Sequence, residues 1–388
     1  MKPQNDSNKL VFLAENLSQK DDLLCIFCKK INWLAENTEY EVYLILTEKN
    51  KKPARYALSP KVTMINLDVN YEQLEGHGFI YRLLPFWYKQ CIHKLRLKDA
   101  LCKIKPFATV SMMGKELSFL SRIGDGSIKI YEFHSDKMVH MCINNVGIST
   151  LVNRIKKCSY LVRMALFITK QDIVVFDTEC LYKNLNKMFK NTVVIHNPLK
   201  EYPLVLDKNE SMKVMAVGDY LSINSFNHLI DVWERISHKY PNWRLHLYGF
   251  GNQDYCRNQI VSKHLGKVIQ CYDRPNDLSG IYSKYAIFVQ AYEFDMFGWH
   301  LMEAMSYGLP CVAYDVPYGP QDVINDESNG FLVKPNQLVD FASKVGILIR
   351  KDDLREEMGK RAHEDICKYE INSIMKEWIN LYESISLR

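Results

Sequence analysis

The stretch from Ala286 to Val333 constrains the fold of this chain more than any other part of the sequence. Ala286–Ala291 is an apolar run of strand length, and Cys311–Tyr314 is a second one. Between them, Gly298–Tyr307 has the apolar spacing of a helix, which Gly308-Leu309-Pro310 closes. Strand, loop, helix and strand in this order form a βαβ unit, whose strands run parallel with a right-handed crossover. The sequence therefore predicts an open parallel sheet.

The loop after the first of these strands is the expected ligand site, because open parallel sheets bind ligands beyond the carboxyl ends of their strands. This loop, Tyr292–Phe297, is acidic and aromatic. A helix start at Gly298 offers free amide groups, the positive end of the helix dipole, and room for a phosphate or sugar. Glu303 lies about 7–8 Å further along the helix axis. This layout suits a nucleotide sugar, in which a ribose and a hexose flank a diphosphate.

These residues resemble the donor-site signature of retaining glycosyltransferases of the GT-B fold, the glycogen-synthase-like family 4 of group 1 glycosyl transferases. The family has glutamate where this chain has Asp295. The resemblance implies an α/β protein with two Rossmann-like domains that face each other across a cleft. It also implies a nucleotide-sugar donor and no cofactor or metal ion. The matching residues are Asp295, Phe297-Gly298, Glu303-Ala304-Met305, Gly308-Leu309-Pro310, Tyr318-Gly319-Pro320 and Asn329-Gly330-Phe331-Leu332-Val333.

The resemblance assigns roles to individual residues of this stretch. Asp295 is expected to contact the hexose hydroxyls and Glu303 the ribose. Glu293 is an alternative to Asp295 as the working acid. Taken singly, Asp295 could be a helix cap and Glu303 a solvent-facing residue, but their spacing within a matching stretch favours the functional roles. The remaining residues of the stretch that are expected to bind the substrate are Phe297, Gly298, Trp299, Tyr318 and Gly319.

A second part of the predicted donor site follows the strand Met212–Val217. The family usually has Arg directly after the glycine at this strand end and Lys five residues later, and both hold the diphosphate. Here Gly218 is followed by Asp219, and Asn224 stands at the second position. Losing two charge-assisted hydrogen bonds of about 1.5–3 kcal/mol each would slow the reaction about 10²–10⁴-fold. Arg274 or Lys284 is a candidate replacement cation, with a solvated surface position as the alternative for each.

The chain has 388 residues, which is too long for one ordinary core and predicts two domains. Strands at Leu10–Ala14, Glu41–Leu46 and Val62–Leu67 alternate with helices, as in a Rossmann-like domain. The resemblance implies an N-terminal acceptor domain, which we place at residues 1–200, a donor domain at 201–370, and a final helix at 371–388 that crosses back to the first domain. The loop Ser18–Asp22 contains no glycine, although the family often has a glycine-rich loop there.

One candidate catalytic residue comes from the first half of the chain. The predicted strand Lys129–Phe133 ends at His134, and the end of a strand is where an α/β domain places ligand contacts. The family often has a histidine near this position that contacts the transferred hexose. A satisfied structural histidine is the alternative interpretation for His134.

Composition excludes several classes of protein. Hydrophobic residues make up 47% and charged residues 24% of the chain, and no apolar run reaches membrane-spanning length. The polar start, Met1–Lys9, is unlike a signal peptide. Eleven cysteines without a repeated spacing indicate reduced thiols in the cytoplasm rather than disulfides or a metal site. A net charge of +5 is too small to imply nucleic-acid binding.

The segment Tyr81–Lys105 alternates basic residues with aromatic and aliphatic ones and contains a single acid, Asp99. Such a helix can lie on an anionic membrane surface, here the inner face of the membrane. The alternative is a solvated lysine face above an ordinary packed face. The sequence leaves both interpretations open.

Three functions are consistent with these features. The first is a retaining glycosyltransferase that moves a hexose from a nucleotide diphosphate sugar to a surface glycan or a lipid-linked acceptor. In the second, the protein keeps the fold without turnover and acts as a binding or scaffolding subunit. A transferase that uses a nucleoside monophosphate sugar is the third.

Overall fold

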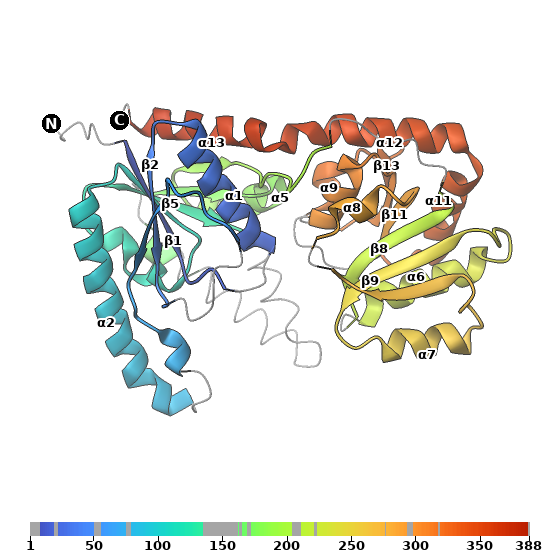
Figure 1. Ribbon diagram of the computed structural model, residues 1–388, viewed down its shortest axis with the longest axis horizontal. Coiled ribbons are helices and arrows are strands. Elements are labelled where there is room, and N and C mark those ends of the chain that lie inside the picture. Colours follow the sequence, from blue (N-terminus) through green and yellow to red (C-terminus); the bar gives the residue numbers. More distant parts are fainter. Residues whose placement is uncertain are drawn as a thin grey trace. The chain divides into compact units, whose positions relative to one another are not determined.

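A computed structural model describes most of the chain and divides it into two compact units (Figure 1). Unit 1 combines Met1–Pro198 with Ile371–Arg388, and unit 2 is Leu199–Glu370. The described residues are 8–18, 22–49, 56–74, 79–134, 162, 165–168, 172–203, 211–220, 223–275, 277–292, 298–316 and 319–386. Within these ranges the side chains of residues 22, 79–83, 219 and 223–225 are not described.

Unit 1 is built on a seven-stranded sheet in the order β3-β2-β1-β4-β5-β6-β7, with every pair of neighbours parallel. The strand sequences are rich in valine, isoleucine, leucine and phenylalanine, and the central strands are buried, as expected for a parallel sheet covered on both faces. The strands are β1 (Lys9–Ala14), β2 (Glu41–Leu46), β3 (Thr63–Asn66), β4 (Ala108–Ser111), β5 (Ile128–Phe133), β6 (Ile173–Phe176) and β7 (Thr192–Val194).

The helices of unit 1 include α13, which ends the described part of the chain. They are α1 (Asp22–Asn37), α2 (Phe79–Ile104), α5 (Glu179–Leu185) and α13 (Ile371–Ser386), with short 3-10 turns at η1 (Tyr71–Leu74), η2 (Lys115–Ser118), η3 (Leu120–Arg122) and η4 (Asn186–Met188). The last helix, α13, packs against α1. Its Tyr382 ring meets the rings of Tyr40 and Phe107 edge-on, and its Trp378 ring lies 5.0 Å from the Lys30 ammonium.

Unit 2 is built on a six-stranded parallel sheet in the order β10-β9-β8-β11-β12-β13. Helix α6 packs against α7 and α11, and α9 packs against α8 and α12. The strands are β8 (Lys213–Asp219), β9 (Arg244–Phe250), β10 (Ile269–Asp273), β11 (Ile287–Gln290), β12 (Cys311–Tyr314) and β13 (Gly330–Val333). The helices are α6 (Ile223–Ile236), α7 (Asp254–Ser262), α8 (Ser279–Tyr282), α9 (Trp299–Ser306), α10 (Pro320–Val323), α11 (Leu338–Arg350) and α12 (Asp352–Ile366), followed by η5 (Cys367–Tyr369).

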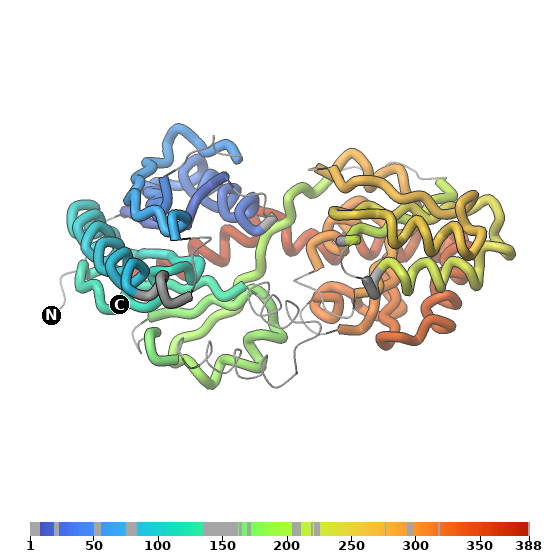
Figure 2. Tube along the Cα trace, turned by 90° about the horizontal axis from the view of Figure 1, so that it is seen from below, coloured from blue at the N-terminus to red at the C-terminus, as the bar shows by residue number. Residues whose placement is uncertain are grey.

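The α/β class with two parallel sheets, predicted from the sequence, is confirmed. The predicted βαβ unit is β11, α9 and β12, and β11 and β12 pair in parallel register. The chain trace of each unit can be followed in Figure 2. Among the described residues, no helix is both long enough and apolar enough to cross a membrane.

Candidate functional site

The sheet of unit 2 has a topological switch point between β8 and β11. The first strand, β8, pairs with β9 on one side and with β11 on the other, so the connections leave this point in opposite directions. Open parallel sheets bind ligands outside the carboxyl ends of the two strands at such a point. The residue just past β11 contacts the end of β8, because the Tyr292 hydroxyl donates to the Val217 carbonyl at 2.8 Å.

Gly218 is required at the end of β8 by the close approach of two aromatic side chains. A Cβ atom on Gly218 would lie 2.1 Å from the Tyr292 hydroxyl oxygen and 2.9 Å from the Phe226 ring. The next residue, Asp219, completes β8 and pairs in register with Phe250 of β9. The Asp219 side chain, and that of Asn224 in the first turn of α6, are outside the described part of the structure. Their predicted roles stay predictions.

Helix α9 begins at the same edge of the sheet. Its N-cap, Gly298, has φ 72° and ψ 33°, a left-handed conformation that glycine adopts without strain. Its carbonyl accepts from the Met302 amide at 2.9 Å, and Trp299 is the buried first residue of the helix. The predicted sugar-contacting residues Asp295 and Phe297, with the alternative Glu293, lie outside the described residues, as does Tyr318. Gly319 directly precedes α10.

Glu303 is buried on α9 and is held by three donors. One carboxylate oxygen accepts from the Tyr282 hydroxyl at 2.7 Å and lies 3.2 Å from Nδ1 of His300, and the other pairs with the Lys200 ammonium at 3.1 Å. Burial alone would raise the pKa of this carboxyl, but His300, Lys200 and Tyr282 outweigh burial and lower the pKa from 4.5 to about 2. Glu303 is therefore ionised at neutral pH and is not the solvent-facing residue that its helical position alone would suggest.

The three residues that hold Glu303 were not predicted from the sequence. His300 precedes Glu303 by three positions, and residues three apart are neighbours on one helix face. The sequence spacing could therefore have indicated this partner. Tyr282 comes from α8 and Lys200 from the second residue of unit 2, and no local pattern connects either of them with α9. Lys200 is fixed because its neighbours are anchored. The Leu199 amide donates to the Tyr369 carbonyl at 2.8 Å, and the Tyr307 hydroxyl donates to Glu201 at 3.2 Å.

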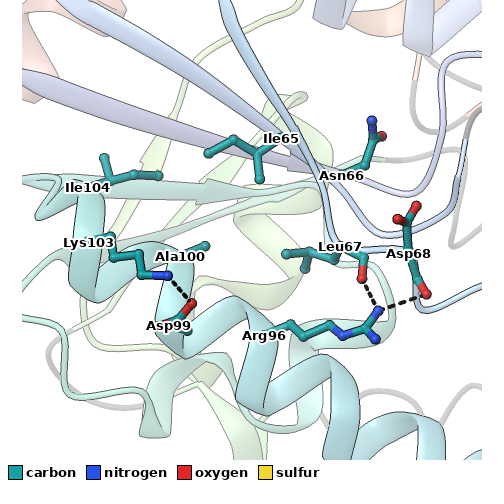
Figure 3. Close-up of a pocket in the computed structure, with 9 residues that line it drawn as sticks. All are labelled: Ile65, Asn66, Leu67, Asp68, Arg96, Asp99, Ala100, Lys103 and Ile104. Atoms are coloured by element: carbon teal, nitrogen blue, oxygen red, sulfur yellow. Dashed lines mark hydrogen bonds and ion pairs between the residues drawn. The ribbon is translucent and has the colours of Figure 1, made fainter.

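Arg274 and Lys284, the two candidates to replace the missing Arg and Lys of the donor site, lie in different surroundings. The Arg274 guanidinium follows β10 and lies 4.8 Å from the centre of the Phe250 ring, near the carboxyl ends of β9 and β10. Lys284 is exposed after α8. The described residues also line a recess of about 490 Å³ in unit 1, which contains none of the predicted site residues (Figure 3).

His134 belongs to unit 1 and lies buried at the carboxyl end of β5. Its Nε2 is 3.4 Å from Glu132 and its Nδ1 is 3.6 Å from Asp177, while the Asn197 amide nitrogen lies 3.4 Å from Nδ1. Glu132 also pairs with Lys30 of α1. His134 is thus part of a buried charge network of Lys30, Glu132, His134 and Asp177. Its predicted contact with the sugar stays a prediction.

This network is expected to make the stability of unit 1 depend on pH. Burial lowers the pKa of His134, but Asp177 and Glu132 outweigh burial and raise it above 6.5. Burial raises the pKa of Glu132, but Lys30 and His134 lower it from 4.5 to about 2. The contribution of His134 to the free energy of unfolding is complete below pH 6.5 and disappears as the pH rises through the pKa of His134 in the folded state. The contribution of the Glu132 carboxyl is complete above pH 4.5 and disappears as the pH falls toward 2.

The contribution of this network to the urea midpoint of unit 1 is therefore expected to be greatest between pH 4.5 and 6.5 and to fall on both sides. His134→Asn should flatten the alkaline side of this profile and leave the acid side in place. An unchanged alkaline slope in that variant would show that His134 does not carry this pH dependence.

Comparison with known proteins identifies the fold of the chain and the family of its second half. The crystal structure of an S. aureus TarM mutant in complex with fondaparinux, alpha-GlcNAc-glycerol and UDP matches with a TM-score of 0.70 and 14% identity. The match covers 96% of this chain and 99% of that chain. At this identity the likeness shows the fold alone, and the fold is the GT-B fold expected from the sequence.

Residues 205–365 match the family described as glycosyl transferases group 1, and this part of the chain is a domain of that family. An uncharacterized glycosyltransferase of Haemophilus influenzae is 28% identical over 217 residues, 55% of this chain and 62% of that protein. The poly(ribitol-phosphate) alpha-N-acetylglucosaminyltransferase of Staphylococcus aureus is 28% identical over 212 residues, 54% of this chain and 41% of that protein. The chain thus spans less than two thirds of the length of either relative.

Proposed function

We propose that this protein is a retaining glycosyltransferase that moves a hexose from a nucleotide diphosphate sugar to a surface glycan or a lipid-linked acceptor. The observation that carries this proposal is the buried, ionised Glu303 beside the helix start at Gly298. The pair lies at the switch point of a group 1 glycosyl transferase domain. A carboxylate kept ionised in a buried position accepts hydrogen bonds from sugar hydroxyls strongly.

The donor is proposed to bind with its diphosphate at the start of α9. The amide groups after Gly298 point at the phosphates, and the helix dipole favours their charge. A ribose hydroxyl donates to Glu303. A carboxylate has about four acceptor positions, and Tyr282, His300 and Lys200 use three of them. Asp295 contacts the hexose. UDP in the complex of the structurally similar TarM supports a nucleoside diphosphate as the donor's leaving group.

With Arg and Lys missing at positions 219 and 224, the backbone amides at the start of α9 are proposed to stabilise the leaving diphosphate, without a metal ion. The Lys200 ammonium pairs with the Glu303 carboxylate, so its charge holds that acid in place. The bond between the anomeric carbon and the diphosphate oxygen breaks, and a bond from that carbon to an acceptor hydroxyl oxygen forms. The hydroxyl proton passes to the departing diphosphate.

The acceptor is proposed to be a polymer or lipid-linked glycan of the cell surface, assembled in the cytoplasm at the inner face of the membrane. The name of the Staphylococcus aureus relative, which places N-acetylglucosamine on poly(ribitol-phosphate), supports an acceptor of this class. His134 is proposed to approach the sugar from unit 1.

A thermal-shift panel tests this function directly. Nucleoside mono- and diphosphates and nucleotide sugars are added singly to the full chain, and a ligand at about 100 times its Kd should stabilise the protein by about 2.7 kcal/mol. We expect one nucleotide diphosphate sugar, and its nucleoside diphosphate, to raise the melting temperature selectively, and chromatography to detect slow hydrolysis of that sugar. Selective stabilisation by a monophosphate sugar would indicate a transferase that uses such a donor. Indifference to the whole panel would contradict the proposal and leave a binding or scaffolding subunit.

A further inference from the structure

Helix α2 of unit 1 has two apolar faces, and among the described residues only one of them is packed. The inward face is formed by residues three or four positions apart that contact the rest of unit 1, among them His93, whose ring meets those of Tyr71 and Phe119. The buried residues of this face are Gln90, His93, Leu97, Leu101 and Ile104. In both Figure 1 and Figure 2 the helix runs along the outside of unit 1.

The outward face of α2 is also apolar, which a helix on the surface of a protein ordinarily avoids. Its large side chains are strongly exposed: Leu84 82%, Trp87 66%, Tyr88 69% and Leu95 68%. With the exposed Cys91 and Cys102, these positions fall within an arc of about 100° at 3.6 residues per turn. The arc lies opposite the packed residues. We call these six residues the outward stripe.

Lysines accompany the outward stripe. The exposed cations near it are Lys94, Lys98, Lys103 and Lys105, against the single acid Asp99, which pairs with Lys103 at 2.7 Å. Two other basic residues of α2 are occupied on the inward side. Lys89 donates to the Val69 and Asn70 carbonyls, and Arg96 donates to the Leu67 and Asp68 carbonyls, as Figure 3 shows for Arg96. Among the described residues of α2, the exposed Lys94 and Lys98 therefore supply positive charge beside the outward stripe.

We propose that the outward stripe of α2 lies in the surface of an anionic lipid bilayer. Leucine and tryptophan enter the boundary between headgroups and acyl chains, tyrosine keeps its hydroxyl at the headgroups, and Lys94 and Lys98 meet the anionic phosphates. The membrane contact itself is argued from α2 alone. Its purpose rests on the proposed function, because the contact would bring the acceptor and the donor site to the same surface. The lysines favour a negatively charged partner, and the tryptophan and tyrosine favour one with an apolar layer beneath a polar surface.

The test measures binding of the full chain to sedimented vesicles. Vesicles of phosphatidylcholine are compared with vesicles that contain about 30% phosphatidylglycerol, a chosen fraction that resembles an anionic leaflet. We expect binding to the anionic vesicles and at least tenfold weaker binding to the neutral ones. The triple variant Leu84→Ser/Trp87→Ser/Leu95→Ser should lose binding to both, and Lys94→Gln/Lys98→Gln should weaken anionic binding by roughly tenfold or more.

Matched controls come from exposed residues of unit 2. Val261→Ser/Val339→Ser removes apolar residues that are 70% and 71% exposed, and Lys267→Gln/Lys351→Gln removes two exposed lysines. Both controls should bind vesicles as the wild type does. All variants are checked for the wild-type melting temperature, so that a loss of binding is not a loss of folding.

Three results would overturn the proposal. One is a wild-type chain that binds neither vesicle. The second is equal binding by the triple variant and the wild type. The third is a wild-type chain that is a stable dimer in solution while the triple variant is a monomer, because a second copy would then cover the outward stripe. The nucleotide panel is run on the same samples without lipid, so failure of membrane binding and failure of the proposed function are observed separately.

Discussion

Lys30→Met is expected to lower the free energy of unfolding of unit 1 by about 3–5 kcal/mol. The Lys30 ammonium and the Glu132 carboxylate are both almost fully buried, with side-chain exposures of 4% and 3%. Without Lys30, the network keeps Glu132 and Asp177 against His134 alone, so one carboxylate is left without a compensating charge in a place that water does not reach. Urea unfolding followed by circular dichroism measures the loss.

The matched control is Lys103→Met on α2. Lys103 pairs with Asp99 at 2.7 Å, but the two side chains are 74% and 65% exposed. An ion pair in water contributes at most about 1 kcal/mol, so this variant should unfold almost as the wild type does. The double variant Lys30→Met/Glu132→Leu should recover part of the stability, because it removes the unpaired charge together with its partner. Equal stability of Lys30→Met and Lys103→Met would contradict the buried network.

Glu303→Gln is expected to lower kcat/KM for the nucleotide sugar by about 10- to 150-fold. The substitution keeps the shape of the side chain and removes the charge. A hydrogen bond to a charged group contributes about 1.5–3 kcal/mol, and each 1.36 kcal/mol corresponds to a factor of about ten in rate. The loss of negative charge also leaves Lys200 and His300 without the carboxylate that now fixes them. Steady-state kinetics, with the thermal shift by the nucleoside diphosphate as a binding readout, measure the effect.

Glu364→Gln is the control for this prediction. Glu364 lies in the same unit on α12, pairs loosely with Lys360 at 3.8 Å and is 59% exposed. It should leave both kinetics and nucleotide binding unchanged. Lys200→Met removes the ammonium that pairs with Glu303 at 3.1 Å, so this variant measures separately what that ion pair contributes. Wild-type kinetics in Glu303→Gln would remove the main support for the proposed donor site.

Much of the fold could be predicted from local sequence patterns. The strand at Cys311–Tyr314 has the predicted bounds, and the predicted helix at Gly298–Tyr307 is α9, Trp299–Ser306. Buried parallel strands are continuous apolar runs between turn residues, so each leaves a local signal. Several elements of unit 2 were not predicted from the sequence, among them β10 and α7. Strand β10 lies at the sheet edge with polar residues in it, and α7 has weak apolar periodicity.

The candidate site could be predicted only in part from the sequence. The glycine at 298 and the acid at 303 stand out because a helix start and its spacing are local features. The residues that hold Glu303 ionised are not local, because Lys200 lies 103 positions earlier in the chain and Tyr282 is on another helix. The same holds for His134, whose partner Asp177 comes from a different strand end.

By itself, the sequence determined the class of fold, the order of the strands along the chain, and the acid and glycine of the donor helix, because these follow from patterns within one segment. Only the tertiary structure decided which charges meet and which apolar face is packed. In α2 both faces are apolar in the sequence, and only packing against unit 1 showed that His93 and Leu97 are inside while Trp87 and Leu95 are outside. Burial and pairing depend on segments far apart in the chain, and no local pattern contains them.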